Sequence, residues 1–260
     1  MFEPLNDLAS ARILITNDDG IRAPGIALLE RIARELSKDV WVVAPDAEQS
    51  AVAHSLTVRR PLRVLNQGER RFSVDGTPTD SVFLAVRQIL ADRPPDLILS
   101  GINNGGNLGE DVTYSGTVAA AMEGTLLGVR SIALSRRYTP GEPTPWETAG
   151  YWAATVIRRF AAQGWSRDTL LNVNFPARPP TEVTGVETVR QGRRFHADEL
   201  TRRVDPHGQD YYWIGGQRAE DKGEPGTDLY AIAHGAVSVT PLRVDFTDFD
   251  TLARLDTASP

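Results

Sequence analysis

The sequence predicts an α/β fold, in which a doubly wound, mostly parallel sheet lies between two layers of helices. Short apolar runs, such as those at residues 12–16, 40–44 and 96–100, alternate with helical patterns over the first ~135 residues. These runs are continuously apolar, and strands of that kind are buried on both faces. The expected architecture is therefore a Rossmann-like core of three layers.

Helical patterns separate the predicted strands. One of them, from Pro24 to Lys38, places five apolar side chains on one face: Ile26, Leu29, Ile32, Ala33 and Leu36. The tetrapeptide Thr77-Pro78-Thr79-Asp80 has the form of a capping box with proline at the first helical position, and it predicts a helix that runs to about Asp92. A small-residue helix at 117–127 and a strand at 129–134 complete this half of the chain.

Two regions depart from this alternation. At 56–75, the short alternating runs "LRVL" and "RFSV" flank "NQGER" and predict an inserted antiparallel hairpin. Further along, the pattern predicts a helix at 144–164, strands at four segments, and an exposed loop at the polar run 218–228. The four predicted strands are at 170–175, 183–191, 211–215 and 231–242.

Length and composition indicate one soluble domain over residues 1–260. The chain has 41% hydrophobic and 24% charged residues, and no apolar run is long enough to span a bilayer. We place the Rossmann-like core at about residues 12–135. We expect residues 136–260 to add the remaining core elements, together with C-terminal strands and hairpins that serve oligomerisation.

Three features of the sequence limit the expected location of the protein and the chemistry of its sites. The first ten residues lack the basic and apolar segments of a secretory signal. The chain has no cysteine, which excludes disulfides, thiolate metal sites and cysteine nucleophiles and fits the cytoplasmic location that we expect. The net charge of −6 argues against a general nucleic-acid-binding protein, because such binding needs a basic surface.

Three predicted strand ends carry loops that are rich in oxygen donors. The first strand ends in "NDDG", where Asp18 and Asp19 are adjacent, and the second leads to Ser50 in "APDAEQSA". The third opens the loop "GINNGGNLG" at 101–109. In a doubly wound sheet, ligands bind beyond such strand ends. Carboxylates, a hydroxyl and amides are the donors that a hard divalent cation such as Mg²⁺ or Mn²⁺ prefers.

A phosphate group fits beside such a cation. Two carboxylates and a dication carry about zero net charge, so a phosphate dianion meets little repulsion there. Glycines in the third loop allow close backbone approach, and the helix that starts near Thr117 offers N–H groups to an anion. We select Asn107, Ser115, Gly116 and Thr117 as the candidates for phosphate binding.

Each of these signals also has a plainer interpretation. Adjacent aspartates at a strand end usually form turns or helix caps, and asparagines among glycines usually form turns. Ser115 has the character of a simple N-cap. His54 follows the second strand, from where it could act as a general acid or base, and Asp111 lies near the same edge. The coincidence of these signals at successive strand ends favours a site.

The sequence resembles the SurE family, the survival-protein 5′-nucleotidases, from Ile13 to about Phe246. The most specific segment is "LSGINNGGNLGEDVTYSGTVAAAMEG", at 99–124. The other segments that carry the resemblance are "ILITNDDG", "APGI", "VVAPD" leading to Ser50, "HSLT", "VDGTPTDSV", "LNVNFP" and "TDLYAIAHGAVSVTPL".

The resemblance implies a metal-dependent phosphatase of nucleoside 5′- and 3′-monophosphates, which in some members also trims short polyphosphate. It implies one divalent cation per subunit, with ligands that match Asp18, Asp19, Ser50 and Asn103. It also implies homodimers or homotetramers with exchanged C-terminal segments. Residues 47–49, Ala-Glu-Gln, depart from the pattern, because basic or amide residues are common there; we expect this change to weaken the attraction for phosphate or to alter the substrate preference.

We therefore expect a Mg²⁺- or Mn²⁺-dependent phosphomonoesterase of nucleotides, with Asp18 and Asp19 as its catalytic residues. A metal-bound water is the predicted nucleophile, and a role for either aspartate as base or as nucleophile stays open. The alternative is a nucleotide-binding sensor or scaffold without turnover. A dinucleotide-dependent oxidoreductase is disfavoured, because "NDDG" stands where a G-x-G-x-x-G turn is needed.

Overall fold

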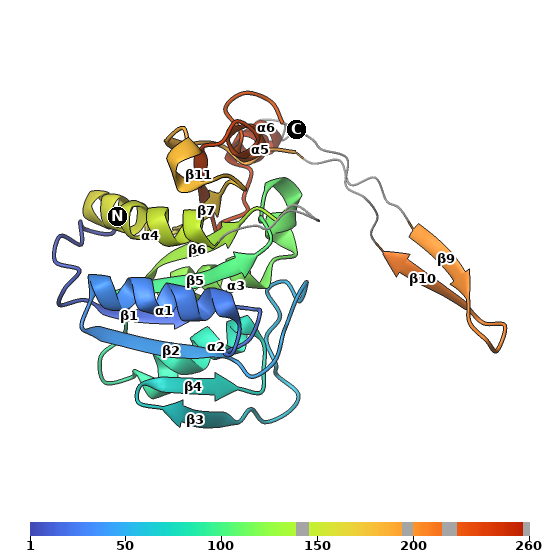
Figure 1. Ribbon diagram of the computed structural model, residues 1–260, viewed down its shortest axis with the longest axis horizontal. Coiled ribbons are helices and arrows are strands. Elements are labelled where there is room, and N and C mark those ends of the chain that lie inside the picture. The colour runs from blue at the N-terminus through green and yellow to red at the C-terminus, as the bar shows by residue number, and fades with distance from the viewer. Residues whose placement is uncertain (139–145, 194–199, 215–222, 257–260) are drawn as a thin grey trace.

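A central sheet with helices on both faces forms the body of the computed structural model, which describes residues 1–138, 146–193, 200–214 and 223–256 (Figure 1). The strands are β1 (Arg12–Thr16), β2 (Asp39–Pro45), β3 (Val64–Gly68), β4 (Arg71–Val74), β5 (Leu97–Asn104), β6 (Arg130–Arg136), β7 (Thr169–Phe175), β8 (Val186–Thr188), β9 (Leu200–Val204), β10 (Asp210–Ile214) and β11 (Val237–Arg243). The α-helices are α1 (Pro24–Leu36), α2 (Pro78–Leu84), α3 (Gly116–Leu126), α4 (Glu147–Gln163), α5 (Asp228–Ala233) and α6 (Phe249–Asp256).

The sheet is doubly wound, as predicted. Its strand order is β3-β4-β2-β1-β5-β6-β7-β11-β8. From β4 to β7 every neighbouring pair is parallel, whereas β3 and β11 join antiparallel to their neighbours β4 and β7. The chain moves outward in opposite directions from the centre, to β2 on one side of β1 and to β5 on the other. This switch point between β1 and β5 is where such sheets bind ligands.

Alternate side chains of the parallel strands enter two separate hydrophobic layers. Ile13 and Ile15 of β1 pack with α1 and α4, whereas Leu14 of the same strand packs with α2 and α3. Figure 1 shows α1 and α4 on one face of the sheet and α2 and α3 on the other. The predicted apolar face of α1 is buried along its whole length. The three-layer prediction is therefore confirmed.

Two local predictions are confirmed with changed details. The predicted hairpin is β3 and β4, and it extends the main sheet because β4 pairs in parallel with β2. The capping box forms, since Thr77 Oγ1 accepts from the Asp80 amide at 3.0 Å and Asp80 Oδ2 accepts from the Thr77 amide at 2.9 Å. The α-helix ends at Leu84 and continues as a π-helical turn at Ala85–Ile89, so it stops short of Asp92.

In the second half of the chain, the structure corrects three predictions. The run at 231–242 was expected to be one strand, but its start belongs to α5 and only β11 is extended. Thr227 caps α5, Gly235 with φ 84° ends it, and a short apolar run fits a buried helix as well as a strand. The predicted strand at 183–191 shortens to β8. Asp228, expected in an exposed loop, is fully buried at the start of α5.

β9 and β10 form a separate antiparallel hairpin, which we call the arm (β9 with β10). It projects away from the sheet in Figure 1. Its cross-strand pairs place Leu200, Val204, Tyr212 and Ile214 on one face, and all four side chains are exposed. The described helices include none that is long and apolar enough to cross a bilayer.

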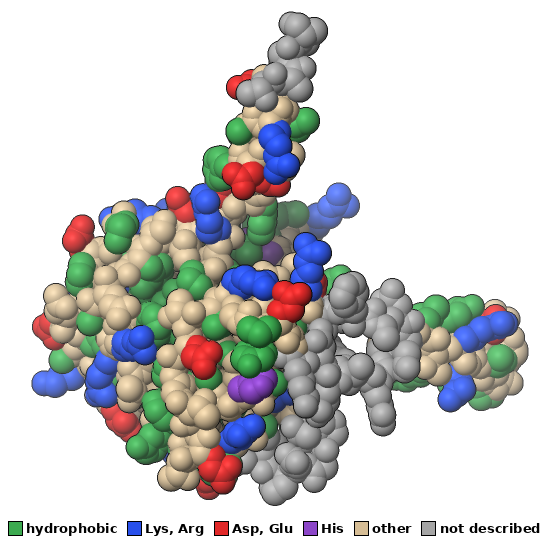
Figure 2. Space-filling model, turned by 90° about the horizontal axis from the view of Figure 1, so that it is seen from above, with side chains coloured by type: hydrophobic (Ala, Val, Ile, Leu, Met, Phe, Trp, Pro, Cys, Tyr) green, Lys and Arg blue, Asp and Glu red, His purple; other side chains and the backbone are tan. Residues whose placement is uncertain are grey.

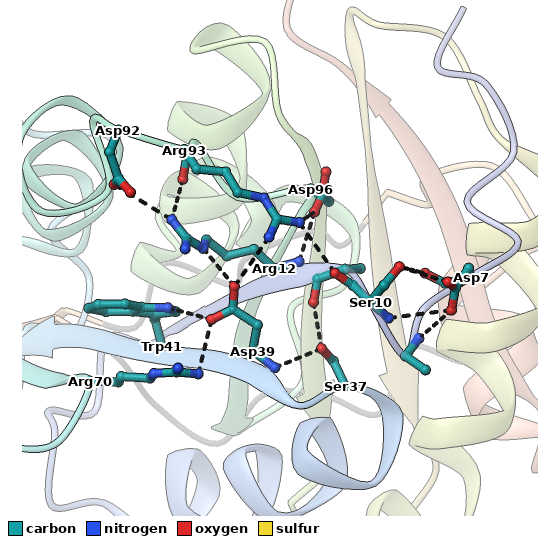
Figure 3. A network of polar contacts seen from close by, with 12 residues as sticks. Asp7, Ser10, Arg12, Ser37, Asp39, Trp41, Arg70, Asp92, Arg93 and Asp96 are labelled. Atoms are coloured by element: carbon teal, nitrogen blue, oxygen red, sulfur yellow. Dashed lines mark hydrogen bonds and ion pairs between the residues drawn. The ribbon is translucent and has the colours of Figure 1, made fainter.

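The amino ends of β1 and β2 are fastened by a charged network (Figure 3). Asp39 at its centre accepts from Arg12 Nε at 2.8 Å, from Trp41 Nε1 at 2.8 Å and from Arg70 Nη1 at 3.0 Å. Partial burial raises the pKa of Asp39, but the hydrogen bonds from Arg12 and Trp41 outweigh it, so the pKa is lowered from its usual value. This network lies at the edge of the sheet opposite to the ends of the parallel strands that carry Asp18 and Asp19.

We expect Asp39→Asn to lower the free energy of unfolding by about 1–2 kcal/mol at neutral pH, because two charge-assisted hydrogen bonds lose their charge. A lowered folded-state pKa stabilises the fold above the unfolded pKa of about 4, and that stabilisation is lost as the pH falls through the folded value. The difference from the wild type should therefore shrink below about pH 4 in urea titrations.

Asp92→Asn is the matched control for this prediction. Asp92 also faces Arg12, at 3.6 Å, but its side chain is 77% exposed. Exposed ion pairs contribute little, so this variant should unfold like the wild type. Equal stability of the two variants would contradict a role for the Asp39 network.

Candidate active site

Three loops and one helix terminus meet at the carboxyl edge of the sheet. The Gln49 amide donates to the backbone carbonyl of Asp18 at 2.8 Å, which joins the loops after β2 and β1. The Asn104 amide donates to Asp19 Oδ2 at 3.3 Å, which brings in the end of β5. Thr117 Oγ1, in the first turn of α3, donates to Asp18 Oδ1 at 2.5 Å. The loops therefore converge as the parallel sheet predicts.

Asp18 is buried against the start of α3. A Cβ atom at Gly116 would lie 2.8 Å from Asp18 Cβ, so only glycine allows this close approach. Burial raises the pKa of Asp18 to about 6, and the charge of Asp19 adds to this effect, while the hydrogen bond from Thr117 opposes it. The folded protein thus holds a carboxylate whose negative charge is poorly compensated.

Asp19 is less buried than Asp18 and is surrounded by charges of both signs. Its pKa is raised, first by loss of solvent and then by the Glu48 carboxylate, while the Asn104 amide and the charge of Arg136 lower it. Arg136 Nη2 also donates to Asn104 Oδ1 at 2.5 Å. Its guanidinium carbon lies 4.2 Å from the centre of the Trp146 ring. Arg136 therefore supports the backbone that holds Asp19.

The other two predicted cation ligands lie in the loops that flank this pair. Ser50 Oγ donates to Glu48 Oε1 at 2.8 Å, and Asn103 Nδ2 donates to the Gly105 carbonyl at 2.8 Å. Asn103 is half-buried, whereas Ser50 is exposed. Ser50 follows Gln49, which binds Asp18, and Asn103 precedes Asn104, which binds Asp19. Backbone hydrogen bonds thus tie both ligand-bearing loops to the aspartate pair.

The donor chemistry of this edge fits a hard divalent cation. Two desolvated carboxylates with raised pKa values leave negative charge that a dication would neutralise. Among the described residues, the buried Oδ1 atom of the neighbouring Asn17 has no hydrogen-bond partner. Over the same residues, no cluster of three or more His, Cys, Asp or Glu side chains suited to a metal is found. With only two carboxylates, a bound cation would keep several waters, as Mg²⁺ does.

Comparisons with known proteins agree with this fold. The family model described as "Survival protein SurE" matches residues 13–198. The chain belongs to the SurE family. This confirms the resemblance inferred from the sequence motifs.

Several relatives resemble this SurE chain over nearly its whole length. A protein named 5′-nucleotidase SurE from Paramagnetospirillum magneticum is 61% identical, over 99% of this chain and 99% of its own. The protein of the same name from Rhodospirillum rubrum is 57% identical, over 98% of each chain. The crystal structure of the SurE protein from Aquifex aeolicus is 40% identical and superposes with a TM-score of 0.84, covering 95% of this chain and 98% of its own.

The predicted phosphate-binding residues of this SurE chain fall into two groups. Ser115, Gly116 and Thr117 lie at the start of α3 beside Asp18, where Ser115 Oγ accepts from the Val118 amide and caps the helix. Asn107 lies within the third loop with its side chain buried, and its side-chain nitrogen donates to Ser135 Oγ at 2.8 Å. The first group therefore lies beside Asp18, whereas the side-chain nitrogen of Asn107 is already hydrogen-bonded to another side chain of the protein.

The other two residues considered from the sequence lie further along the same edge. His54 Nε2 is 2.8 Å from Glu123 Oε2, about two turns into α3 from Gly116. Asp111 is buried in the 3₁₀ turn at Gly109–Thr113. Among the described residues, the His54 side chain is hydrogen-bonded to Glu123 and not to Asp18 or Asp19.

Sequence reasoning missed Arg136 and Asn174 at this site. Asn174 Oδ1 accepts from the Asn107 amide at 2.9 Å and so supports the third loop from β7. Asn174 is a polar residue in a predicted strand that is largely apolar, and Arg136 comes two residues after the strand predicted at 129–134. A buried polar side chain needs a partner, and that requirement is the signal that these two residues carry.

We expect Asp18→Asn to stabilise the cation-free protein at neutral pH. The folded state keeps Asp18 protonated up to about pH 6, whereas the unfolded chain releases this proton near pH 4. The free energy of unfolding of the wild type therefore falls as the pH rises from 4 to 6, by up to about 3 kcal/mol. The variant lacks this loss, and its amide oxygen can still accept from Thr117.

Urea titrations in excess EDTA at pH 4.5 and pH 7.5 measure this effect. Asp7→Asn is the control, because Asp7 is exposed and its pKa is lowered by hydrogen bonds from Ser10. Asp7→Asn should bring no gain in stability at pH 7.5. An Asp18→Asn protein that is less stable than the wild type at pH 7.5 would show that burial of Asp18 carries no such penalty.

Proposed function

We propose that this chain hydrolyses nucleoside 5′-monophosphates to nucleoside and phosphate at the carboxyl edge of the sheet. One observation carries the proposal: two adjacent, desolvated carboxylates follow β1, where Asp18 contacts the first turn of α3, in a chain of the SurE family. The proteins from P. magneticum and R. rubrum that match it along its length are named 5′-nucleotidase SurE. Nucleoside 3′-monophosphates and short polyphosphate are further proposed substrates, and the cytoplasm is the proposed location.

One Mg²⁺ or Mn²⁺ ion per subunit is the proposed cofactor. Asp18, Asp19, Ser50 and Asn103 would hold it. When bound, the ion supplies Lewis acidity to a phosphoryl oxygen and lowers the pKa of water. The charge of the site supports this assignment, because the Glu48 carboxylate lies close enough to Asp19 to raise its pKa, and a dication would offset this negative charge.

The two aspartates have different proposed tasks. Asp18 is fixed by Thr117 and by close contact with Gly116, so it suits a fixed ligand. Asp19 is more exposed, and a single amide holds one of its oxygens at 3.3 Å. Asp19 is therefore the better placed to accept a proton from an attacking water or to attack phosphorus itself. Trapping of a phosphoenzyme, combined with ¹⁸O from solvent, distinguishes these two routes.

The start of α3 is the proposed phosphate cradle. Its first-turn N–H groups, at Gly116 and Thr117, lie next to the Asp18 carboxylate, and helix N-termini favour anions. The positive end of the helix partly offsets the carboxylates and Glu48. A sensor without turnover would use the same cradle, and release of phosphate distinguishes the two functions.

We expect Asp19→Asn to lower kcat for AMP hydrolysis by at least about 100-fold while the fold persists, because the variant loses a proposed ligand and the proposed base. Excess EDTA should abolish wild-type activity, and added Mn²⁺ should restore it. Phosphate release measures both effects, and Asp92→Asn, at the opposite edge, serves as the control. Full hydrolysis in EDTA would refute the cation-dependent proposal.

We also propose that the chain is a homodimer or homotetramer held in part by the arm. The arm exposes Leu200, Val204, Tyr212 and Ile214 on one face, around the ion pair of Arg202 with Asp210, and exposed apolar side chains of this size favour a partner. Figure 2 shows the hairpin standing clear of the body with apolar side chains along it.

The double variant Leu200→Glu, Ile214→Glu changes one directly opposed pair on that face of the arm. We expect it to lower the oligomeric mass in sedimentation velocity, because two charges would enter an apolar contact. Tyr151→Glu, at an exposed residue of α4 outside the arm, is the control and should sediment like the wild type. An unchanged mass for the double variant would exclude this face from the interface.

A further inference from the structure

The third loop of the candidate site, at 101–109, is hydrogen-bonded to buried side chains from the second half of the chain. Asn174 Oδ1 accepts from the Asn107 amide at 2.9 Å, and Asn174 Nδ2 donates to the Asn107 carbonyl at 3.1 Å. Asn172 Nδ2 donates to the same carbonyl at 2.8 Å. The Asn174 side chain therefore pairs with the Asn107 backbone as a neighbouring strand would. Both asparagines are fully buried in β7.

Asp228 fixes the far end of the same loop. Its Oδ2 atom accepts from the Gly109 amide at 2.9 Å. Its Oδ1 atom accepts from the amides of Gly192 and Leu229, each at 2.8 Å. Asp228 is 0% exposed, and a buried carboxylate is tolerated only when such donors replace its lost water. Gln191 binds the same residue of the loop, because its Nε2 atom donates to the Gly109 carbonyl at 3.0 Å.

Asp228 also joins the two chain segments at residues 190–192 and 224–228. We call these segments the root of the arm, because they precede and follow the arm in the sequence. Gly192 is near the point where the chain leaves for β9, and Asp228 comes shortly after the chain returns from β10. The Asp228 amide donates to the Arg190 carbonyl at 3.0 Å, and the Arg190 amide donates to the Gly226 carbonyl at 3.1 Å. An exposed ion pair of Arg190 with Glu224, at 2.9 Å, lies at the same root. One carboxylate thus joins the two chain segments of the root to the Gly109 amide.

We propose that Asp228 is a positioning residue of the candidate active site, which makes the root of the arm and the loop at 105–109 one mechanical unit. Asp228 touches none of the proposed cation ligands. It acts through Gly109, whose loop continues back through Asn107 to the proposed ligand Asn103. Its effect on catalysis rests on the proposed function, whereas its hold on the loop does not.

Asp228→Asn is the principal test. An amide group offers one acceptor oxygen in place of two, so the Gly109 or the Gly192 amide loses its partner. We expect hydrogen exchange at residues 105–109 to become at least about tenfold faster, since a hydrogen bond to a carboxylate contributes enough for that factor. We expect kcat for AMP at saturating Mn²⁺ to fall about tenfold, with KM within about twofold of the wild type, because the loop's ligand is displaced more than the cradle at α3.

Two further variants make the test specific. Glu224→Gln breaks only the exposed ion pair at the root of the arm, so its loop exchange and its kcat should match those of the wild type. Gln191→Leu removes the donor to the Gly109 carbonyl and leaves Asp228 in place. It should speed exchange at 105–109 to a smaller extent, and it decides the proposal if Asp228→Asn does not fold.

The outcomes separate this inference from the proposed function. Wild-type exchange at 105–109 in folded Asp228→Asn overturns the proposal, and so does equal loosening of that loop by Glu224→Gln. If Asp228→Asn does not fold, wild-type exchange in Gln191→Leu overturns it. If the wild type releases no phosphate from AMP with Mn²⁺, the proposed function fails, and the exchange comparison still decides whether Asp228 holds the loop.

Discussion

The fold depends on one electrostatic constraint: two adjacent carboxylates must lie at a buried strand end without driving the loops apart. Asp18 and Asp19 are shielded from solvent by these loops, and this loss of solvent is the main reason why the pKa of each is raised. The protein offsets it with the Thr117 hydroxyl, the Asn104 amide and the charge of Arg136. Each of these donors comes from a different element, so the aspartate pair also determines how those elements are placed.

The amino and carboxyl edges of the sheet differ in how well their charges are compensated. At the amino edge, Asp39 is matched by Arg12, Arg70 and Trp41, so charge there stabilises the fold. At the carboxyl edge, negative charge exceeds what nearby donors compensate, and this lowers stability. Between them lie two dry layers in which Ile13, Leu14 and Ile15 are completely buried. Burial of that kind supplies the free energy that a charged, partly unsatisfied edge costs.

Sequence reasoning succeeded where the signal is local and failed where the partner is distant. The capping box, the hairpin and the oxygen-rich strand ends each depend on a few consecutive residues, and the structure brings the strand ends together. Asn174 and Asp228 act on backbone amides 67 and 119 residues away, so no spacing in the sequence reveals them. The same limit explains the run at 231–242, since only tertiary contacts decide whether a short apolar segment is helix or strand.

The departure at residues 47–49 fits the same electrostatic logic. Glu48 lies close enough to raise the pKa of Asp19, so the site carries more negative charge than one with basic residues at this position. Arg136, stacked on Trp146, returns one positive charge from β6, but it is bound to Asn104 and almost fully buried. The charge of Arg136 therefore offsets the charge of Asp19 within the protein and is little available to attract a phosphate from solution. Under the proposed function, attraction of a phosphate then falls to the cation and to the start of α3.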